Sequence, residues 1–305
     1  MTLIIQTDCA QAHIIGERSI NGRENKMKSA MIAIAVALIP VPALAQDAVK
    51  FADPALQSII EQKLGVENPS REDLEALIEL DASSRGIKSV AGLEGAVNLT
   101  TLILEDNEIS DIGPLSSLTS LVKLNLIENN VSDISALSAM RALQVLELHF
   151  NNVEDLKPLA ELTRLKVLSM CDNKISDISP LAGLTALNTL QLEVNSISDI
   201  SSVSRMNELR EFEADYNKIT NVSPLSALTK LQILELENND ISDISPLAQL
   251  ILVKTLDLRD NDISDVATIG RLTGLKYLYL IGNPADSKQI ETTTKDLQSL
   301  KAVRF

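Results

Sequence analysis

The sequence predicts an α/β repeat solenoid: an arc with a parallel β-sheet on its concave face, an N-terminal helical cap and a short C-terminal cap. The first observation behind this prediction is that asparagine recurs every 22 residues along most of the chain. A fixed period of this length is typical of proteins whose units stack only on their neighbours. The recurring residues are Asn107, Asn129, Asn151, Asn173, Asn195, Asn217, Asn239, Asn261 and Asn283.

The second observation is the frame around each asparagine, LxxLxLxxNxIxDIxPLxxL, in which apolar residues keep their places from unit to unit. Two of its leucines, such as Leu102 and Leu104, alternate with mostly polar residues, which indicates a short strand with one buried face. We expect the asparagine amide to be buried and to pair with backbone groups of a turn that points into the core. Asn195→Ala should therefore destabilise the fold, whereas Gln191→Ala, on the outward face, should cost almost nothing.

Aspartate also recurs four places after the asparagine, and only Asn221 interrupts this column between Asp111 and Asp265. A row of carboxylates suggests a metal site. Turn capping is the favoured interpretation, however, because Asp and Asn accept local backbone hydrogen bonds, and Pro follows in several units.

The ends of such a stack need covering. We expect a helical cap at residues 46–79, repeats at 80–283 and a C-terminal cap at 284–305. Asp53 followed by Pro54 predicts the start of a helix that Gly65 ends, and Ser70 with Asp73 resembles a capping box. After the repeats, a helix or a hairpin would close the stack through Ile290, Leu297, Leu300 and Val303.

Residues 27–45 have the composition of a secretory signal peptide: a lysine, an apolar stretch and an Ala-Leu-Ala cleavage site. We therefore expect cleavage before Gln46 and export to the periplasm, the cell surface or the medium, with no membrane insertion afterwards. Residues 1–26 are interpreted as a gene-model extension, with a long natural n-region as the alternative.

The formal net charge of the 305-residue chain is −15. This charge disfavours nucleic acid as a partner, because phosphates require Lys and Arg, and it favours a basic protein. Of the two cysteines, only Cys171 would remain after cleavage, so no internal disulfide is expected. We expect a monomer without a cofactor.

Segments such as LNLIENNVSDISAL and LELENNDISDISPL resemble the leucine-rich repeats of bacterial internalins, and the DPALQSIIEQKLG segment is similar to the internalin N-terminal cap. The resemblance covers residues 50–283 and implies a right-handed arc whose concave sheet binds a protein. No Ig-like module or wall anchor is recognisable after the repeats, and concave aromatic residues are few. The resemblance therefore does not imply host-cell invasion.

In each unit, we expect the residues four, six and seven places after the first leucine to face outward on the concave sheet. Repeated from unit to unit, these positions form three columns. Thirteen of these thirty positions are acidic and one is basic. Exposed aromatic residues beside charges are typical of interface hot spots. The candidate partner-binding residues are Glu147, His149, Phe150, Glu193, Glu211, Glu213, Asp215, Tyr216, Glu235, Glu237, Asp257, Arg259, Tyr277 and Tyr279.

Three interpretations of this acidic face remain open: a solvated surface without a ligand, a site for the basic patch of a protein, and a Ca²⁺ site at Glu213, Glu235 and Asp257.

The sequence contains no recognised catalytic motif. The leading hypothesis is thus an exported, non-enzymatic protein-binding module that uses its acidic concave face. The alternatives are a structural spacer of the cell envelope and a cytosolic subunit similar to eukaryotic phosphatase regulators.

Overall fold

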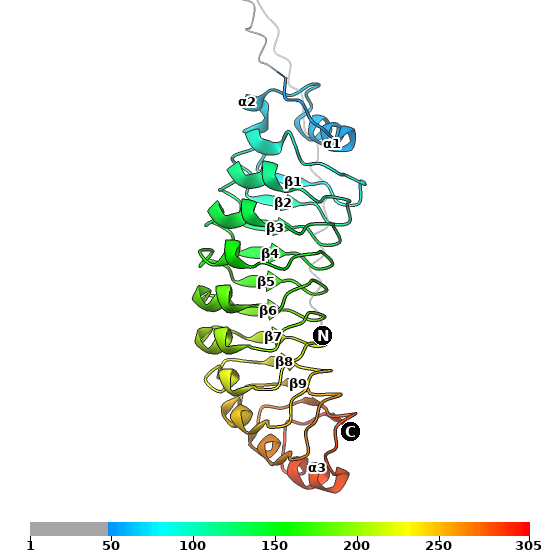
Figure 1. The fold of residues 1–305 in the computed structure, drawn as a ribbon, viewed down its shortest axis with the longest axis vertical. Helices are drawn as coiled ribbons and strands as arrows, with labels where there is room; N and C mark the ends of the chain where they lie inside the picture. The colour runs from blue at the N-terminus through cyan, green and yellow to red at the C-terminus, as the bar shows by residue number, and fades with distance from the viewer. Residues whose placement is uncertain (1–47) are drawn as a thin grey trace, which may run out of the picture. The chain divides into compact units, whose positions relative to one another are not determined.

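Short parallel strands, each of three residues, pair in sequence order into one sheet (Figure 1). The computed structural model describes residues 48–305. The strands of this region are β1 Glu79–Asp81, β2 Thr101–Ile103, β3 Lys123–Asn125, β4 Val145–Glu147, β5 Val167–Ser169, β6 Thr189–Gln191, β7 Glu211–Glu213, β8 Ile233–Glu235, β9 Thr255–Asp257, β10 Tyr277–Tyr279 and β11 Ala302–Arg304.

From β1 to β10, residues one repeat apart are direct neighbours: Leu102 pairs with Leu124, and Leu124 with Leu146. The middle residue of each of these strands is buried, and all are leucine except Phe212. The predicted strands are confirmed. The register turns each position of the repeat into a column that crosses the sheet.

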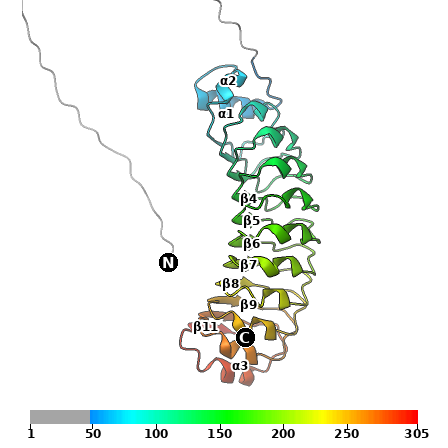
Figure 2. The same cartoon turned by 90° about the vertical axis from the view of Figure 1, so that its left-hand side faces the viewer.

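The side opposite the sheet is built from 3₁₀-helices (Figure 2). Each 3₁₀-helix follows an aspartate of the predicted column, except that one follows Asn221 and the first follows Gly92. For example, Asp111 Oδ1 accepts a hydrogen bond of 2.8 Å from the Gly113 amide. The turn-capping interpretation is thus confirmed. The helices are η1 Leu93–Gly95, η2 Gly113–Ser117, η3 Ser135–Ala139, η4 Lys157–Leu159, η5 Ser179–Gly183, η6 Ser201–Arg205, η7 Ser223–Leu225, η8 Ser245–Gln249 and η9 Ala267–Arg271.

The core lies between the sheet and these helices and is almost wholly aliphatic. The inward isoleucine or valine two places after each asparagine is completely buried from Ile109 to Ile263. Every repeat therefore fills the same positions with side chains of similar volume, which is how close packing is kept from one turn to the next.

The asparagine ladder ties each turn to the one before it. Asn151 Oδ1 accepts from the Val131 amide at 2.9 Å, and Asn151 Nδ2 lies 2.8 Å from the Leu126 carbonyl oxygen. Nδ2 is also 3.2 Å from the carbonyl oxygen of Leu148 in its own turn. These contacts recur along the ladder, and Asn129, Asn151, Asn239 and Asn261 are buried. The predicted role of the amide is confirmed.

The N-terminal cap contains helix α1 (Pro54–Leu64) and helix α2 (Arg71–Leu74). Asp53 Oδ1 accepts from the Ala55 amide, and Gly65 ends α1 with a left-handed φ of 68°. Ser70 and Asp73 form the predicted capping box. The sheet begins at Glu79, one residue inside the predicted cap, because β1 pairs with β2 as a regular first turn.

At the other end, helix α3 (Ser287–Thr294) is followed by β11, which pairs in parallel with β10. The hairpin alternative was wrong, since a hairpin requires antiparallel strands. Within the described residues α-helix is confined to the two caps, so the α part of the predicted class does not extend through the repeats. Ile290 and Leu297 are buried against the last turn.

The predicted signal peptide at 27–45 and the segment 1–26 lie outside the described residues. Within residues 48–305, no helix is long and apolar enough to cross a bilayer.

We predict that Asn151→Ala lowers the free energy of unfolding by about 1–3 kcal/mol, because backbone groups of two turns lose their buried partner. Urea titration monitored by circular dichroism measures this change.

The matched control is Asn130→Ala. Asn130 is exposed and its side chain makes no hydrogen bond within the described residues, so its replacement should change stability by less than about 0.5 kcal/mol. Equal losses for the two variants would contradict the structural role of the ladder.

Candidate partner-binding surface

The strand residues on either side of the buried leucine form two columns on the outward face of the sheet. Glu213 of β7 pairs directly with Glu235 of β8, and Glu235 with Asp257 of β9. The predicted carboxylates are therefore brought together. These side chains are not fully exposed, since neighbouring strands are only about 4.8 Å apart. Asp257 retains only 4% of its accessible surface.

One outward column was missed by the sequence analysis: the first residue of each strand, from Thr101 and Lys123 to Tyr277. The alternation of strand residues would have revealed it, because positions two apart face the same way. Of this column, only Glu211 and Tyr277 were among the predicted residues. Lys123 adds a second cation to the face and forms an ion pair of 2.9 Å with Glu147.

Gln191 is also more constrained than the sequence suggested. Its amide oxygen accepts from the buried Ser169 hydroxyl at 2.7 Å, and its amide nitrogen donates to Glu213 at 2.8 Å. We therefore expect Gln191→Ala to cost more than its outward position suggested, because the change removes the partner of a buried hydroxyl.

The second predicted column follows each strand and runs from His149 through Cys171, Glu193 and Asp215 to Glu237. The Cys171 thiol donates to Glu193 Oε2 at 2.5 Å, and His149 Nδ1 accepts from the Cys171 amide at 3.2 Å. Burial raises the pKa of the Cys171 thiol, which disfavours the reactive thiolate. Burial likewise lowers the pKa of His149.

The third predicted column is a turn, and its backbone is left-handed. Nine residues of this column, from Ser84 to Asp260, have φ between 50° and 55°, and Gly282 follows with φ of 82°. Each turn amide is paired to the next repeat, as the Val194 amide is to the Asp215 carbonyl oxygen at 2.9 Å. The frequent Asp, Asn and Gly of this column were the available signal, because these residues tolerate that conformation.

Three residues of the turn column are bulky: Phe150, Val194 and Tyr216. Left-handed backbone costs such residues about 1–2 kcal/mol, and β-branched side chains are the least suited to it. These residues remain 51%, 47% and 47% exposed, so the described residues cover only part of each. Tyr216 Oη lies 3.1 Å from Glu237 Oε1.

Arg259 neutralises the carboxylates at the C-terminal side of the predicted cluster. Its guanidinium donates to both oxygens of Asp257 at distances from 2.6 to 2.9 Å, and it also pairs with Glu237. It lies 5.6 Å from the centroid of the Tyr279 ring. Because Arg259 occupies both oxygens of Asp257, the calcium alternative has no geometric support. Residues 48–305 contain no group of three or more possible ligands placed to hold a metal.

On the strands and in the second predicted column between Lys123 and Arg259, five carboxyl groups have no ion pair with any described residue: Glu193, Glu211, Glu213, Asp215 and Glu235. Burial, reinforced by the neighbouring carboxylates, raises the pKa of Asp215 and of Glu235 to about 7. The same causes raise the pKa of Glu193 and of Glu211. The centre of the concave face is thus an acidic cluster that is partly protonated near neutral pH.

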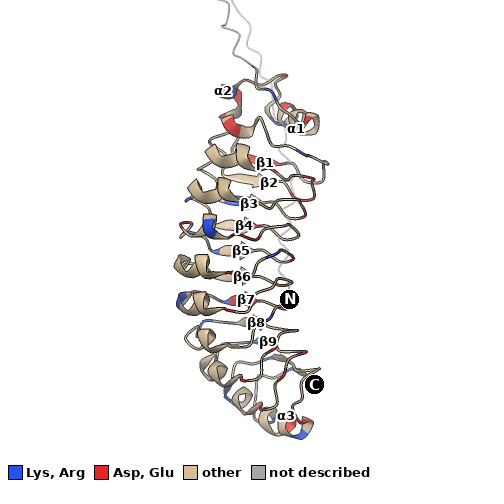
Figure 3. Cartoon of the chain, viewed as in Figure 1, with Lys and Arg blue, Asp and Glu red and all other residues tan. Residues whose placement is uncertain are grey.

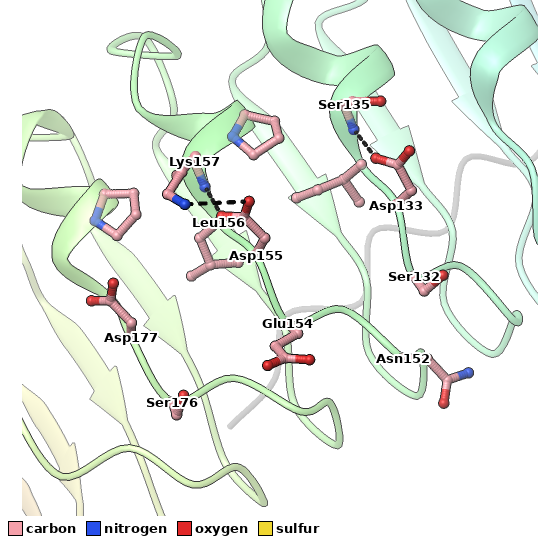
Figure 4. A pocket seen from close by; sticks show the side chains of 13 residues that line it. Ser132, Asp133, Ser135, Asn152, Glu154, Asp155, Leu156, Lys157, Ser176 and Asp177 are labelled. Atoms are coloured by element: carbon pink, nitrogen blue, oxygen red, sulfur yellow. Dashed lines mark hydrogen bonds and ion pairs between the residues drawn. The ribbon is translucent and has the colours of Figure 1, made fainter.

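A separate depression of about 580 Å³ lies among the turns and 3₁₀-helices that follow the ladder (Figure 4). None of its lining residues is on a strand. Its aspartates, Asp133, Asp155 and Asp177, cap the helices through the amides of Ser135, Lys157 and Ser179. The depression contains none of the predicted site residues.

Comparison with known proteins agrees with this geometry. The model of the family described as leucine-rich repeats in two copies matches residues 97–139, 141–183, 163–205 and 207–249. A crystal structure of an internalin, inlF, from Listeria monocytogenes is 28% identical and aligns over 86% of this chain and 99% of that one, with a TM-score of 0.51. The chain is an internalin-like leucine-rich repeat protein.

Two further structures share the fold of this internalin-like protein. The functional domain of InlJ from Listeria monocytogenes has a TM-score of 0.74 at 23% identity, over 85% of this chain and 57% of that one. A leucine-rich repeat protein from Leptospira interrogans has a TM-score of 0.72 at 26% identity, over 77% and 62% respectively. The chain therefore spans less than two thirds of these two proteins. No curated protein matches it.

We predict that the internalin-like protein becomes less stable as the pH rises from about 5 to about 8. The folded-state pKa of Asp215 and Glu235 is about 7, above the value of about 4 expected when unfolded. These groups therefore contribute stability that is complete below the unfolded pKa and is lost as the pH rises through the folded pKa. Thermal unfolding at several pH values measures the loss.

Glu235→Gln should flatten this dependence, because the amide stays neutral at every pH. Glu154→Gln, an exposed control remote from the cluster, should leave it unchanged. The lowered pKa of His149 acts in the opposite direction below about pH 6.5, so the comparison above that pH is decisive. The same slope in the Glu235→Gln variant as in the unmodified protein would contradict the prediction.

Proposed function

We propose that the chain is an exported, non-enzymatic protein-binding module that recognises a basic surface of its partner through the concave face. The observation that supports this most is the group of five unpaired carboxyl groups on β6–β8 and the residues that follow. Like charges on adjacent strands repel one another, so their retention is unfavourable for folding alone. A cationic partner would remove that repulsion on binding.

Related proteins support the same class of function. Leucine-rich repeat proteins, internalins among them, act as protein-binding modules. In the described residues of this chain, acidic groups occur along the whole stack, from the cap helices to α3 (Figure 3). Such a field attracts basic proteins and repels acidic ones during encounter.

Export is part of the proposal and is supported by the sequence of residues 27–45 alone. The partner would then be a protein of the cell envelope or of the medium. We infer that the module acts as a monomer, since the concave face would remain open to a partner.

The test is a crosslinking pull-down from the envelope and medium of the source cell. The unmodified chain is one bait, and a variant with Glu213→Lys and Glu235→Lys is the other. We expect a protein captured by the first bait to be lost from the second, because two cluster carboxylates become cations. Glu237 is left unchanged, since its ion pair with Arg259 is structural.

The control bait carries Glu154→Lys and Glu291→Lys, which make the same change in net charge at exposed positions away from the strands. It should capture the partner as the unmodified chain does. Equal loss with both variants would indicate only a general charge effect. Capture of no protein by any bait would favour a structural spacer instead.

A further inference from the structure

The five unpaired carboxyl groups and two of the three exposed bulky turn residues lie at the same strands. Val194 follows β6 and directly succeeds Glu193, and Tyr216 follows β7 and directly succeeds Asp215. Both side chains are 47% exposed. The most electronegative part of the face is thus edged by apolar surface, within two adjacent turns.

The apolar edge is not a requirement of the fold. The other positions of the turn column carry Ser, Asp, Glu, Asn or Gly, apart from Phe150, and adopt the same left-handed backbone. The turn is held by its backbone amide, which pairs with the next repeat whatever the side chain is. Val194 and Tyr216 therefore expose apolar surface where a small polar residue would suit the backbone better.

The charge around these residues indicates what would cover them. Within the described residues, the two cations that flank these carboxyl groups are already paired: Lys123 with Glu147, and Arg259 with Asp257 and Glu237. No described Lys or Arg pairs with Glu193, Glu213, Asp215 or Glu235. An acidic or a purely apolar partner would leave these carboxyl groups buried without a counter-charge, which is costly.

We propose that Val194 and Tyr216, with Glu193, Glu213, Asp215 and Glu235, form a docking site for an exposed protein segment in which basic and apolar side chains are neighbours. This inference rests on the proposed function and defines the partner more closely. We name these six residues the acid–apolar patch. Basic side chains of the segment pair with the carboxylates, and its apolar side chains pack against Val194 and the Tyr216 ring.

Phe150 lies outside the patch. It is 51% exposed and has the same backbone conformation, but it lies two turns from Val194. The nearest strand carboxylate, that of Glu147, already has its counter-charge from Lys123. Phe150 therefore provides a control matched in exposure, conformation and type of residue.

The experiment measures binding of two synthetic peptides to the purified chain by fluorescence anisotropy. One peptide alternates arginine with leucine, and the other, of equal charge and length, alternates arginine with serine. We expect the arginine–leucine peptide to bind at least about tenfold more tightly, because its apolar side chains are buried at the patch. Equal affinity for the two peptides would overturn the inference, as would no binding of either.

The variants are Val194→Asn, Tyr216→Asn and the control Phe150→Asn. Asparagine suits left-handed backbone, so all three should unfold at the same temperature as the unmodified chain or higher. We expect each patch variant to weaken binding of the arginine–leucine peptide by about tenfold. Phe150→Asn should weaken it by less than about threefold. Equal weakening by all three would mean that the apolar contact is not localised at β6 and β7.

The pull-down distinguishes failure of the acid–apolar patch from failure of the proposed function. A partner captured by the unmodified chain, lost with Glu213→Lys and Glu235→Lys, and retained by Val194→Asn and Tyr216→Asn would leave the proposed function standing. It would overturn the acid–apolar patch. Loss of the partner with all of these variants would support both.

Discussion

The asparagine ladder is the interaction on which the rest of the structure depends. Each amide satisfies backbone groups in its own turn and in the preceding one, as Asn151 does with Leu148, Leu126 and Val131. Without it, a turn directed into an aliphatic core would leave buried donors and acceptors unpaired. The ladder therefore sets both the period of the chain and the register of the sheet.

Once the register is set, the outward residues are free to vary. The buried apolar residues and the ladder use fewer than half of the positions of each repeat, and the turn amides pair with the next repeat independently of their side chains. Acids, aromatic residues and single cations can then occupy the concave face without changing the fold. This separation explains why a chain with so regular a core has an irregular surface, and why function is found in the departures from the repeat.

Much of the fold could be predicted because every repeat contains the same residue pattern. The ladder, the strands, the aspartate caps and the N-terminal helix follow from side-chain chemistry at fixed spacing. The 3₁₀-helices did not, because they depend on how many residues remain between the ladder and the next strand. The left-handed turn was signalled only by the Asp, Asn and Gly of its column. The C-terminal strand, Ala302–Arg304, was missed since its segment departs from the repeat.

The site could be predicted only in outline. The acidic columns were placed correctly, but the pairing of Arg259 with Asp257 and Glu237 depends on side-chain conformation, which periodicity does not encode. The partial burial of the strand carboxylates, and hence the raised pKa of Asp215 and Glu235, follows from the close spacing of parallel strands. Sequence alone counts charges, whereas the structure shows which of the described carboxyl groups remain without an ion pair.

The exact 22-residue register has a consequence for how such a chain changes over generations. Since every turn meets the next through the same columns, duplication or loss of one whole unit joins matching surfaces and preserves the ladder. Lys123 and Arg259 would then move apart or together in steps of one strand, about 4.8 Å. The width of the uncompensated acidic segment between them is thus adjustable by recombination, in discrete increments, without redesign of the core.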